Sequence, residues 1–556
     1  MKKNFNKIAS LVLAAAMVAA TPGMVFAHTI TVENSANDTA THTYAAYQIF
    51  KGDLSDGKLS NVVWGSGIDQ AKLGTAAKDI ASALSISEAD AVDAVKVSEA
   101  LSGKADDSDV AQNFADAISE ALGTTTSGTP KSNTIEGLDD GYYFVEDTTE
   151  LSTVQSAKTR FILQVVGGNL TVKAKANVPT SMKKVDENNN DVKDQVDSRI
   201  SDVTLTDKYN DVADYSIGDT IPYELVGTLP DNYDKYETYT YEFTDTMSDG
   251  LTYLNDARVY LDSEAYDITD HFTITPTGET AGATLVITEK DAKGLKDIKT
   301  VNKDSKIIVK YTAKLNNNAK VGLPGNPNTM TLKFSNNPNK GGEGETGTTP
   351  EDKNIVFTYG LDVNKYFDAV DAAKKLDGAK FVVLNSENKV LKVAEDGKIT
   401  WVTAPDVSTL TVNSDAVVSA YTKAGATVLT STDGKISVRG LDEGTYTAKE
   451  IQAPNGYNLA SDTEIQIEAT TANVQNWDGS AATALTEFKY TVANETHTQD
   501  GNEVAIDGVA QADVIDKTGS TLPSTGGMGT TILYVAGAIL VIAGAAVLVI
   551  KKRHEA

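Results

Sequence analysis

Two acidic residues occupy matching positions in a segment that occurs twice in the chain. The stretch 137–147 aligns without gaps with the stretch 440–450, so that Asp147 falls opposite Glu450. Side chains alternate between the two faces of a β-strand, and each acid shares its face with a tyrosine. We therefore expect both carboxyl groups to point toward a core, where burial raises the pKa of an acid and favours its neutral form.

The second copy continues into a longer motif. Residues 446–457 resemble the E-box of collagen-adhesin B-type (CNA-B) domains. In that family a lysine on the first strand and an asparagine on the last strand join as an intramolecular isopeptide bond, assisted by the E-box glutamate. The resemblance implies Glu450 as the promoting acid and Lys365 with Asn494 as the reactive pair. Burial would leave a neutral amine, which could attack the Asn carboxamide and release ammonia.

The middle of the chain repeats this pattern with an aspartate. Alternation places Asp245 on the apolar face of the segment 241–247 and Asn336 on that of the segment 332–336. The residues from Pro179 onward, Pro-x-x-x-Lys-x-Val, resemble the start of fimbrial isopeptide-forming (D2) domains. This resemblance implies Lys183 as the nucleophile, with Lys184 as the alternative.

The first part of the chain has an incomplete set of such residues. Asp147 is a candidate acid and Lys51 a possible nucleophile, but no asparagine on a final strand completes a triad. Charged residues are mostly exposed, so a solvated Asp and Lys are the simpler interpretation.

The C-terminal end carries a processing and anchoring signal. Leu522-Pro523-Ser524-Thr525-Gly526 precedes an uncharged apolar run of 19 residues, 532–550, and a basic cluster, 551–553. The run is close to the roughly 20 residues that span a membrane, and the basic cluster would stay cytoplasmic. The pentapeptide resembles the substrate of sortases, the transpeptidases of Gram-positive bacteria. The resemblance implies cleavage between Thr525 and Gly526 and transfer of the Thr525 carbonyl to an amine.

The N-terminal end predicts export. Three lysines within the first seven residues precede an apolar stretch, 8–20, and small residues precede a cleavage position between Ala27 and His28. The chain has no cysteine although export would permit disulfides, so any covalent cross-link must use other chemistry. Its formal net charge of −28 disfavours binding to nucleic acid.

A lysine that could accept Thr525 precedes the second domain. The segment 170–179 resembles the pilin motif Val-Tyr-Pro-Lys-Asn, and aligning Val172 with its valine places Lys175 on the reactive lysine. Three of the five motif positions differ, so Lys173 remains the competing acceptor.

The sequence predicts an all-β protein of tandem Ig-like or CNA-like sandwiches. We expect a signal peptide at 1–27, an N-terminal domain at 28–177 with a helical insertion between about 68 and 122, and a D2 sandwich at 178–340. A polar linker at 341–354, a CNA-B-like sandwich at 355–517 and the sorting signal at 518–556 follow.

Together these segments resemble a Gram-positive LPXTG-anchored major (backbone) pilin of the SpaA type. The resemblance implies a structural subunit that sortase polymerises head to tail and attaches to the cell wall. Expected partners are sortases, identical subunits, minor pilins, peptidoglycan and host surface ligands. The alternative is a monomeric wall-anchored adhesin or a minor tip or base pilin, which would have no use for Lys175. We expect no metal or other cofactor and no hydrolytic enzyme, because the sequence contains neither His-Glu-x-x-His nor Gly-x-Ser-x-Gly.

Overall fold

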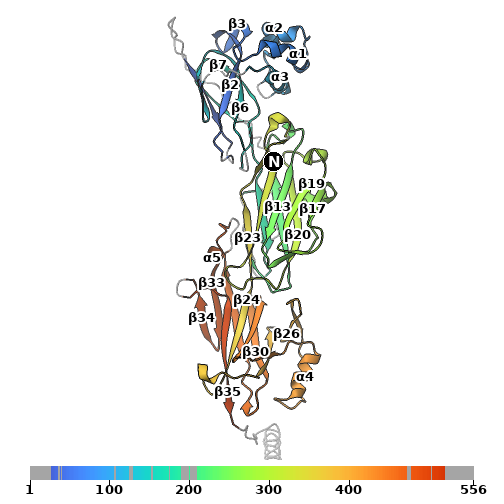
Figure 1. Ribbon diagram of the computed structural model, residues 1–556, viewed down its shortest axis with the longest axis vertical. Coiled ribbons are helices and arrows are strands. Elements are labelled where there is room, and N and C mark those ends of the chain that lie inside the picture. Colours follow the sequence, from blue (N-terminus) through green and yellow to red (C-terminus); the bar gives the residue numbers. More distant parts are fainter. Residues whose placement is uncertain are drawn as a thin grey trace, which may run out of the picture.

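The computed structural model describes residues 27–519 except 36–37, 39, 106–107, 124–128, 152–154, 175, 189–198, 201–208, 343, 473–476 and 502–503. Three β units follow one another along the long axis of the molecule, and helices gather beside the N-terminal one (Figure 1). The predicted fold class, β-sandwiches in tandem with a helical insertion in the first, is confirmed.

The N-terminal unit consists of two four-stranded sheets. The first contains, in order, β4 (Thr129–Lys131), β5 (Thr134–Leu138), β1 (His28–Glu33) and β8 (Leu170–Lys173). The second contains β3 (Lys58–Trp64), β2 (Tyr44–Ser55), β6 (Gly141–Asp147) and β7 (Ile162–Val166). Strand β8 is the last strand of this unit and lies at the edge of the first sheet, parallel to β1. The chain therefore leaves the unit along that edge.

The helical insertion lies between β3 and β4. It comprises α1 (Gln70–Leu84), α2 (Ala94–Leu101) and α3 (Asp109–Ser119). Asp69, Asp93 and Ser108 cap the three helices by accepting hydrogen bonds from backbone N–H groups of the first turn. Apolar side chains that recur at helical spacing, such as Phe114 and Ile118, are buried against the second sheet.

The central unit is a sandwich of two larger sheets. One contains β10 (Tyr209–Asn210), β9 (Ser181–Asp186), β12 (Thr220–Thr228), β20 (Lys306–Leu315), β14 (Leu251–Tyr253) and β18 (Thr280–Ala281), with β15 (Arg258–Leu261) on β20 and β16 (Ser263–Asp267) on β15. The other contains β11 (Val212–Asp214), β23 (Asp352–Phe357), β21 (Asn326–Ser335), β13 (Tyr241–Met247), β19 (Thr284–Glu289) and β17 (Phe272–Thr275), with β22 (Thr346–Thr348) on β21. One large apolar core lies between them.

The segment 341–354, predicted as a linker, is part of the central sandwich. It contains β22 and the start of β23, and both strands pair with β21. Strand β23 also serves two cores, because Val356 packs in the central unit while Ile355 and Phe357 pack in the C-terminal one. Only Thr358 separates β23 from the next strand, so the two units adjoin without a spacer.

The C-terminal unit again has two sheets. The smaller contains β29 (Lys435–Leu441), β24 (Tyr359–Phe367), β35 (Val509–Thr518) and β31 (Tyr457–Asn458). The larger contains β27 (Ile399–Thr403), β26 (Lys389–Val393), β25 (Lys380–Asn385), β30 (Gly444–Gln452), β32 (Thr463–Thr471), β33 (Leu485–Val492) and β34 (Glu495–Gln499), with β28 (Leu429–Thr430) on β25. Helices α4 (Asp415–Lys423) and α5 (Ala481–Ala484) connect strands of this unit.

The repeated segment forms the same structure in the N-terminal and C-terminal units. The Tyr143 hydroxyl donates to the Asp139 carbonyl at 3.0 Å, and the Tyr446 hydroxyl donates to the Asp442 carbonyl at 2.8 Å. In both copies the following acid, Asp147 or Glu450, is buried, as alternation predicts.

Within residues 27–519 as described above, no helix is long and apolar enough to cross a membrane. The predicted apolar run 532–550 and most of the predicted signal peptide lie outside the described residues.

Candidate functional site

A buried lysine of the C-terminal unit lies between two carboxyl groups. Lys365, near the end of β24, is fully buried, and its Nζ lies 3.2 Å from Glu450 Oε1 of β30. The same Nζ donates to Oδ1 of Asp516, which lies on β35. Since β24 and β35 are parallel neighbours with Phe367 opposite Asp516, this contact joins the first and last strands of the unit.

Asp516 replaces the asparagine that we predicted. Asn494 is not near Lys365, because it lies exposed in the turn between β33 and β34 with a left-handed φ of 67°. The choice of Asn494 is therefore corrected to Asp516. The sequence carried a signal for this residue, since Ala510, Ala512 and Val514 alternate on the core face of β35 and Asp516 continues that series.

The setting of Glu450 suits an acid that keeps its proton. Burial raises the pKa of Glu450 to about 7, against the opposing influence of the Ala460 N–H and Lys365, and the charge of Asp516 adds to the rise. A protonated Glu450 can donate to a carboxyl oxygen of Asp516 and make its carbon more electrophilic. A neutral Lys365 amine can then attack that carbon, and an amide forms with loss of water.

The central unit contains a second buried lysine. Lys183 of β9 is fully buried, and its Nζ donates to Oδ2 of Asp245 and, at 2.9 Å, to the hydroxyl of Tyr311. Tyr311 in turn donates to Asp245 Oδ1 at 3.0 Å. Burial lowers the pKa of Lys183, against the opposing charge of Asp245, and raises the pKa of Asp245, against that of Lys183. Both shifts favour the neutral amine and neutral acid that amide formation requires.

Asn336, the predicted partner, does not lie at this site, and the asparagine on the last strand of the unit is Asn354. In β13 and β21 Asp245 lies opposite Met330, and Asn336 lies six residues further along, roughly 20 Å away. Strand β21 is also not the last strand of the unit, because β23 follows it. Asn354 of β23 pairs with Asn328, whose Nδ2 donates to the Tyr311 hydroxyl at 2.8 Å.

Asn354 combines complete burial with unused hydrogen-bonding capacity. Its side chain is fully buried, and neither amide atom has a hydrogen-bond partner among the residues that the structure describes. Its strand lies beside β9, since the Lys183 N–H donates to Asp352 Oδ2 at 2.6 Å. Asn354 lies in the segment that we predicted as a linker. Predicting a strand from Asp352 to Phe357 instead would have indicated this residue.

Lys184, the alternative nucleophile, is directed elsewhere. Its Nζ lies 2.6 Å from Asp211 Oδ1, and both side chains are fully buried. Asp211 Oδ2 also accepts the backbone N–H of Trp477 from the C-terminal unit at 2.8 Å. Lys183 is therefore the lysine that contacts Asp245, as the resemblance to D2 domains implies.

In the N-terminal unit the buried acid meets a histidine instead of a lysine. His42 Nδ1 lies 2.6 Å from Asp147 Oδ2, and Nε2 lies 3.1 Å from Asp38 Oδ2 and 3.0 Å from Ser156 Oγ. Burial alone would lower the pKa of His42, but the hydrogen bonds and charges of Asp147 and Asp38 raise it to about 9. Lys51 is exposed. Among the residues that the structure describes, this cluster therefore joins a histidine to two carboxyl groups and a serine hydroxyl and contains no lysine.

The structure describes only some of the remaining predicted residues. Lys175 and the motif residues Leu522, Pro523, Ser524, Thr525 and Gly526 lie outside the described residues. The competing acceptor, Lys173, is exposed at the end of β8. Ala27 is exposed and His28 opens β1, with its Nε2 at 2.9 Å from Asp140 Oδ1.

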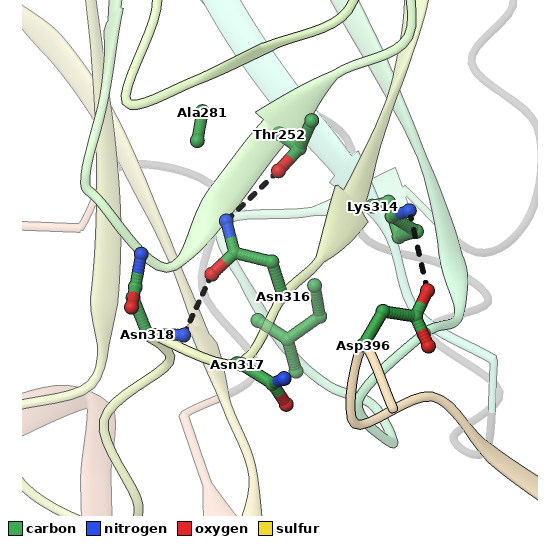
Figure 2. Close-up of a pocket in the computed structure, with 9 residues that line it drawn as sticks. Thr252, Ala281, Lys314, Asn316, Asn317, Asn318 and Asp396 are labelled. Carbon is green, nitrogen blue, oxygen red and sulfur yellow. Dashed lines mark hydrogen bonds and ion pairs between the residues drawn. The ribbon is translucent and has the colours of Figure 1, made fainter. Parts of the chain in front are cut away.

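A shallow polar pocket of about 260 Å³ lies where the central and C-terminal units meet (Figure 2). The Asn316 side chain donates to Thr252 Oγ1 at 2.8 Å and accepts from the Asn318 N–H at 2.8 Å. Lys314 faces Asp396 from the other unit at 4.0 Å. These polar groups form hydrogen bonds and an ion pair with one another. We therefore interpret the pocket as part of the junction between the two units.

Comparison with family models identifies two segments. Residues 364–481 match the SpaA prealbumin-like fold domain, and residues 515–556 match the LPXTG cell wall anchor motif. The chain is therefore an LPXTG-anchored cell-wall protein with a SpaA-type domain, and the anchor motif makes it a sortase substrate. The predicted sorting signal and cell-wall location are confirmed.

The proteins that the chain resembles are surface proteins and backbone pilins. It is 24% identical over 390 residues to the trypsin-resistant surface T6 protein of Streptococcus pyogenes serotype M6, covering 61% of this chain and 65% of that protein. Among solved structures, the T6 backbone pilin of serotype M6 Streptococcus pyogenes has 17% identity, coverage of 89% and 98%, and a TM-score of 0.49. The full-length major pilin SpaD from Corynebacterium diphtheriae has 14% identity, coverage of 89% and 97%, and a TM-score of 0.42.

Proposed function

We propose that the protein is the backbone subunit of a covalent, sortase-assembled pilus on a Gram-positive cell wall. The observation that carries this function is the anchor motif at 515–556 behind two units that each hold a buried lysine and acid between strands. Sortase breaks the Thr525–Gly526 peptide bond and holds Thr525 as an acyl group. The Lys175 amine of another subunit attacks the acyl carbon, the enzyme's nucleophile leaves with a proton, and an amide joins the two subunits.

Repetition of this step gives a filament, because a head-to-tail contact that does not close into a ring extends indefinitely. The last subunit is transferred to peptidoglycan. Minor pilins at the tip or base and host surface ligands complete the expected set of partners.

Two internal bonds reinforce each subunit. In the central unit the Lys183 amine attacks the Asn354 carboxamide, Asp245 supplies and receives protons, and ammonia leaves. In the C-terminal unit Lys365 condenses with Asp516 beside protonated Glu450, and water leaves. The proposed domains are 28–177, 178–357 and 359–518, which moves the second boundary from the predicted linker to Thr358.

Polymerisation is tested in cells that express the protein with its sortase. Lys175→Ala is expected to abolish the high-mass ladder on a denaturing gel, whereas Lys173→Ala leaves it intact. A ladder that persists in Lys175→Ala and disappears in Lys173→Ala would reassign the acceptor. A ladder that persists in both would refute both lysines as the acceptor, whereas the absence of a ladder from the natural protein would favour the monomeric wall-anchored adhesin.

The internal bonds are tested by the intact mass of the chain from His28 to Thr525. We expect a deficit of one ammonia and one water relative to the sequence. Asn354→Ala and Asp516→Ala should each remove one loss. The matched variants Asn336→Ala, Asn494→Ala and Asn328→Ala should keep both. Loss of the ammonia deficit in Asn336→Ala or Asn328→Ala, with retention in Asn354→Ala, would refute the assignment of Asn354.

A further inference from the structure

Strand β8 forms an open edge of the N-terminal unit. In its sheet β8 pairs with β1 on one side, and no strand among the described residues pairs with its other side. Thr171 and Lys173 are exposed, whereas Leu170, Val172 and Ala174 are partly buried against the core of the two sheets. An open edge presents unpaired backbone groups that can bind another extended segment.

The outward-pointing backbone groups of β8 can be identified. The N–H of Ala174 donates to the carbonyl of Glu33 on β1 at 2.8 Å. Backbone groups alternate in direction along a strand, so those of Val172 also point toward β1. The N–H and C=O groups of Thr171 and Lys173 therefore point away from the sheet. The strand ends two residues before Lys175, the acceptor assigned under the proposed function.

We propose that this edge receives the C-terminal tail of a second copy as an added parallel strand, with residues 520–525 beside 170–175. The inference rests on the proposed function, because the linkage of Thr525 to Lys175 sets the direction and the register of the added strand. A parallel strand is required, because only that direction brings the C-terminal end of the tail toward position 175. The added strand would extend the parallel arrangement already present between β1 and β8.

The sequence of the tail fits one register. With Thr525 opposite Lys175, Leu522 lies beside Val172, on the face where the core cluster is only partly covered. Ser520, Leu522 and Ser524 then supply the N–H and C=O groups that bond to Thr171 and Lys173.

The position of proline supports the same register. Pro523 lies opposite Lys173, where the parallel pattern directs its nitrogen away from β8 and needs no donor. A shift by one residue would place proline at a bonding position and turn Leu522 to the exposed face. One register thus satisfies the reactive pair, the apolar contact and the proline.

The occupant must come from another molecule. Strand β35, which ends at Thr518, lies at the opposite end of the molecule from the N-terminal unit (Figure 1). The tail from Gly519 to Thr525 spans about 25 Å at most, because an extended residue covers roughly 3.4 Å. The tail therefore cannot reach the β8 edge of its own chain, and the donor is a second copy. Docking would hold the Thr525 acyl group beside the amine that attacks it.

Cysteine pairing tests this register, because the natural chain has no cysteine. Thr171→Cys and Thr521→Cys lie outside the five-residue sorting motif, and in the proposed register the two residues face each other on adjacent strands. Such strands are about 4.8 Å apart, within the range that a disulfide can bridge. The matched control pairs Thr171→Cys with Ser520→Cys, which lies one residue away on the opposite face.

Polymers released from the wall are oxidised mildly, digested and examined for linked peptides. We expect the 171–521 disulfide at least about tenfold more often than the 171–520 disulfide, because the latter pair points to opposite faces. Equal yields, or no disulfide from either pair, would overturn the added strand. An error in the acceptor assignment would be recognised separately. A high-mass ladder that persists in Lys175→Ala would show that another lysine accepts Thr525, and it would not report on the added strand.

Discussion

At the residue scale, alternation predicts which side chains enter a core but not which ones meet there. Lys183, Lys365, Asp245 and Glu450 are buried where the sequence places them. Their partners differ from the prediction because pairing depends on strand order, which joins residues far apart in the chain. Asn494 lies in a turn and Asn336 lies beyond the reach of Lys183, whereas Asp516 and Asn354 lie on the last strand of each unit. Periodicity also cannot tell whether the partner of Lys365 is an aspartate or an asparagine.

The identity of residue 516 gives a sharp chemical prediction. Condensation of Lys365 with Asp516 releases water, and condensation with an asparagine would release ammonia, yet both reactions leave the same amide. Asp516→Asn should therefore give a folded chain whose intact mass equals that of the natural mature protein. Without a bond, the substitution would change the mass by the difference between an amide and an acid. High-resolution mass measurement separates the two cases, and a mass shift of that size would contradict bond formation at position 516.

The His42 cluster predicts a pH dependence in the N-terminal unit. The pKa of His42 rises from 6.5 to about 9 on folding, so its contribution to stability is complete below pH 6.5 and is lost as the pH rises through 9. We expect the free energy of unfolding of this unit to fall by roughly 3 kcal/mol over that range. Calorimetric unfolding of the chain from His28 to Thr525, followed across pH, measures the effect.

The control for this prediction is His42→Gln, which keeps a polar side chain without a titratable group. Its N-terminal transition should be less stable than the natural one below pH 6.5 and should change less as the pH rises. An equally steep pH dependence in the variant would assign the effect to other groups.

At the element scale, long alternating strands and the helical insertion follow from periodicity, and short polar strands do not. β6, β13 and β30 coincide with segments predicted as strands, and the three helices occupy the predicted interval. Residues 341–354 were predicted as a linker because glycine and charged residues outnumber apolar ones. Their strands are stabilised by pairing with β21 and by two cores, and such tertiary contacts override local composition.

A glycine at the junction of the two larger units provides a prediction about their contact. Gly322 has a φ of 57°, and a Cβ there would lie 2.4 Å from the Asp507 backbone of the C-terminal unit. Gly322→Ala should therefore displace the two segments, since neither backbone can rotate away as a side chain can. We expect a lower unfolding temperature and a changed angle between the units in solution X-ray scattering.

Gly278→Ala is the matched control for this contact. Gly278 also lies in the central unit and has a φ of 105°, but nothing lies within 4 Å of the added Cβ. Both substitutions strain the backbone by about 1 kcal/mol, and only Gly322→Ala adds the collision. Equal effects of the two variants on scattering would mean that this contact does not set the angle.

At the scale of the whole molecule, the two proposed bonds and the proposed acceptor lysine would define a path for tension. Force applied through the proposed filament would enter a subunit at Lys175 and leave at Thr525, so the N-terminal unit before residue 175 would carry no load. From Lys183 the proposed bond would lead to Asn354, the chain continues through Thr358 to Lys365, and the second proposed bond would lead to Asp516. Covalent links would thus bypass both sandwiches. In the N-terminal unit, Asp147 occupies the position that Glu450 has in the C-terminal unit, and it bonds to His42 and not to a lysine.

This path makes a prediction for single filaments under tension. Natural polymers should extend without unfolding steps from the central and C-terminal units. In Lys365→Met polymers the C-terminal unit would lack its bond, and the segment between Lys365 and Asp516, which are separated by 151 positions, can unfold to add roughly 500 Å per subunit, at about 3.4 Å per residue. Polymers of His42→Gln are the control and should show no added step, because the N-terminal unit lies outside the path. Steps in the control would show that tension enters the subunit before Lys175, and their absence in Lys365→Met would contradict the Lys365–Asp516 bond as the link that bears the load.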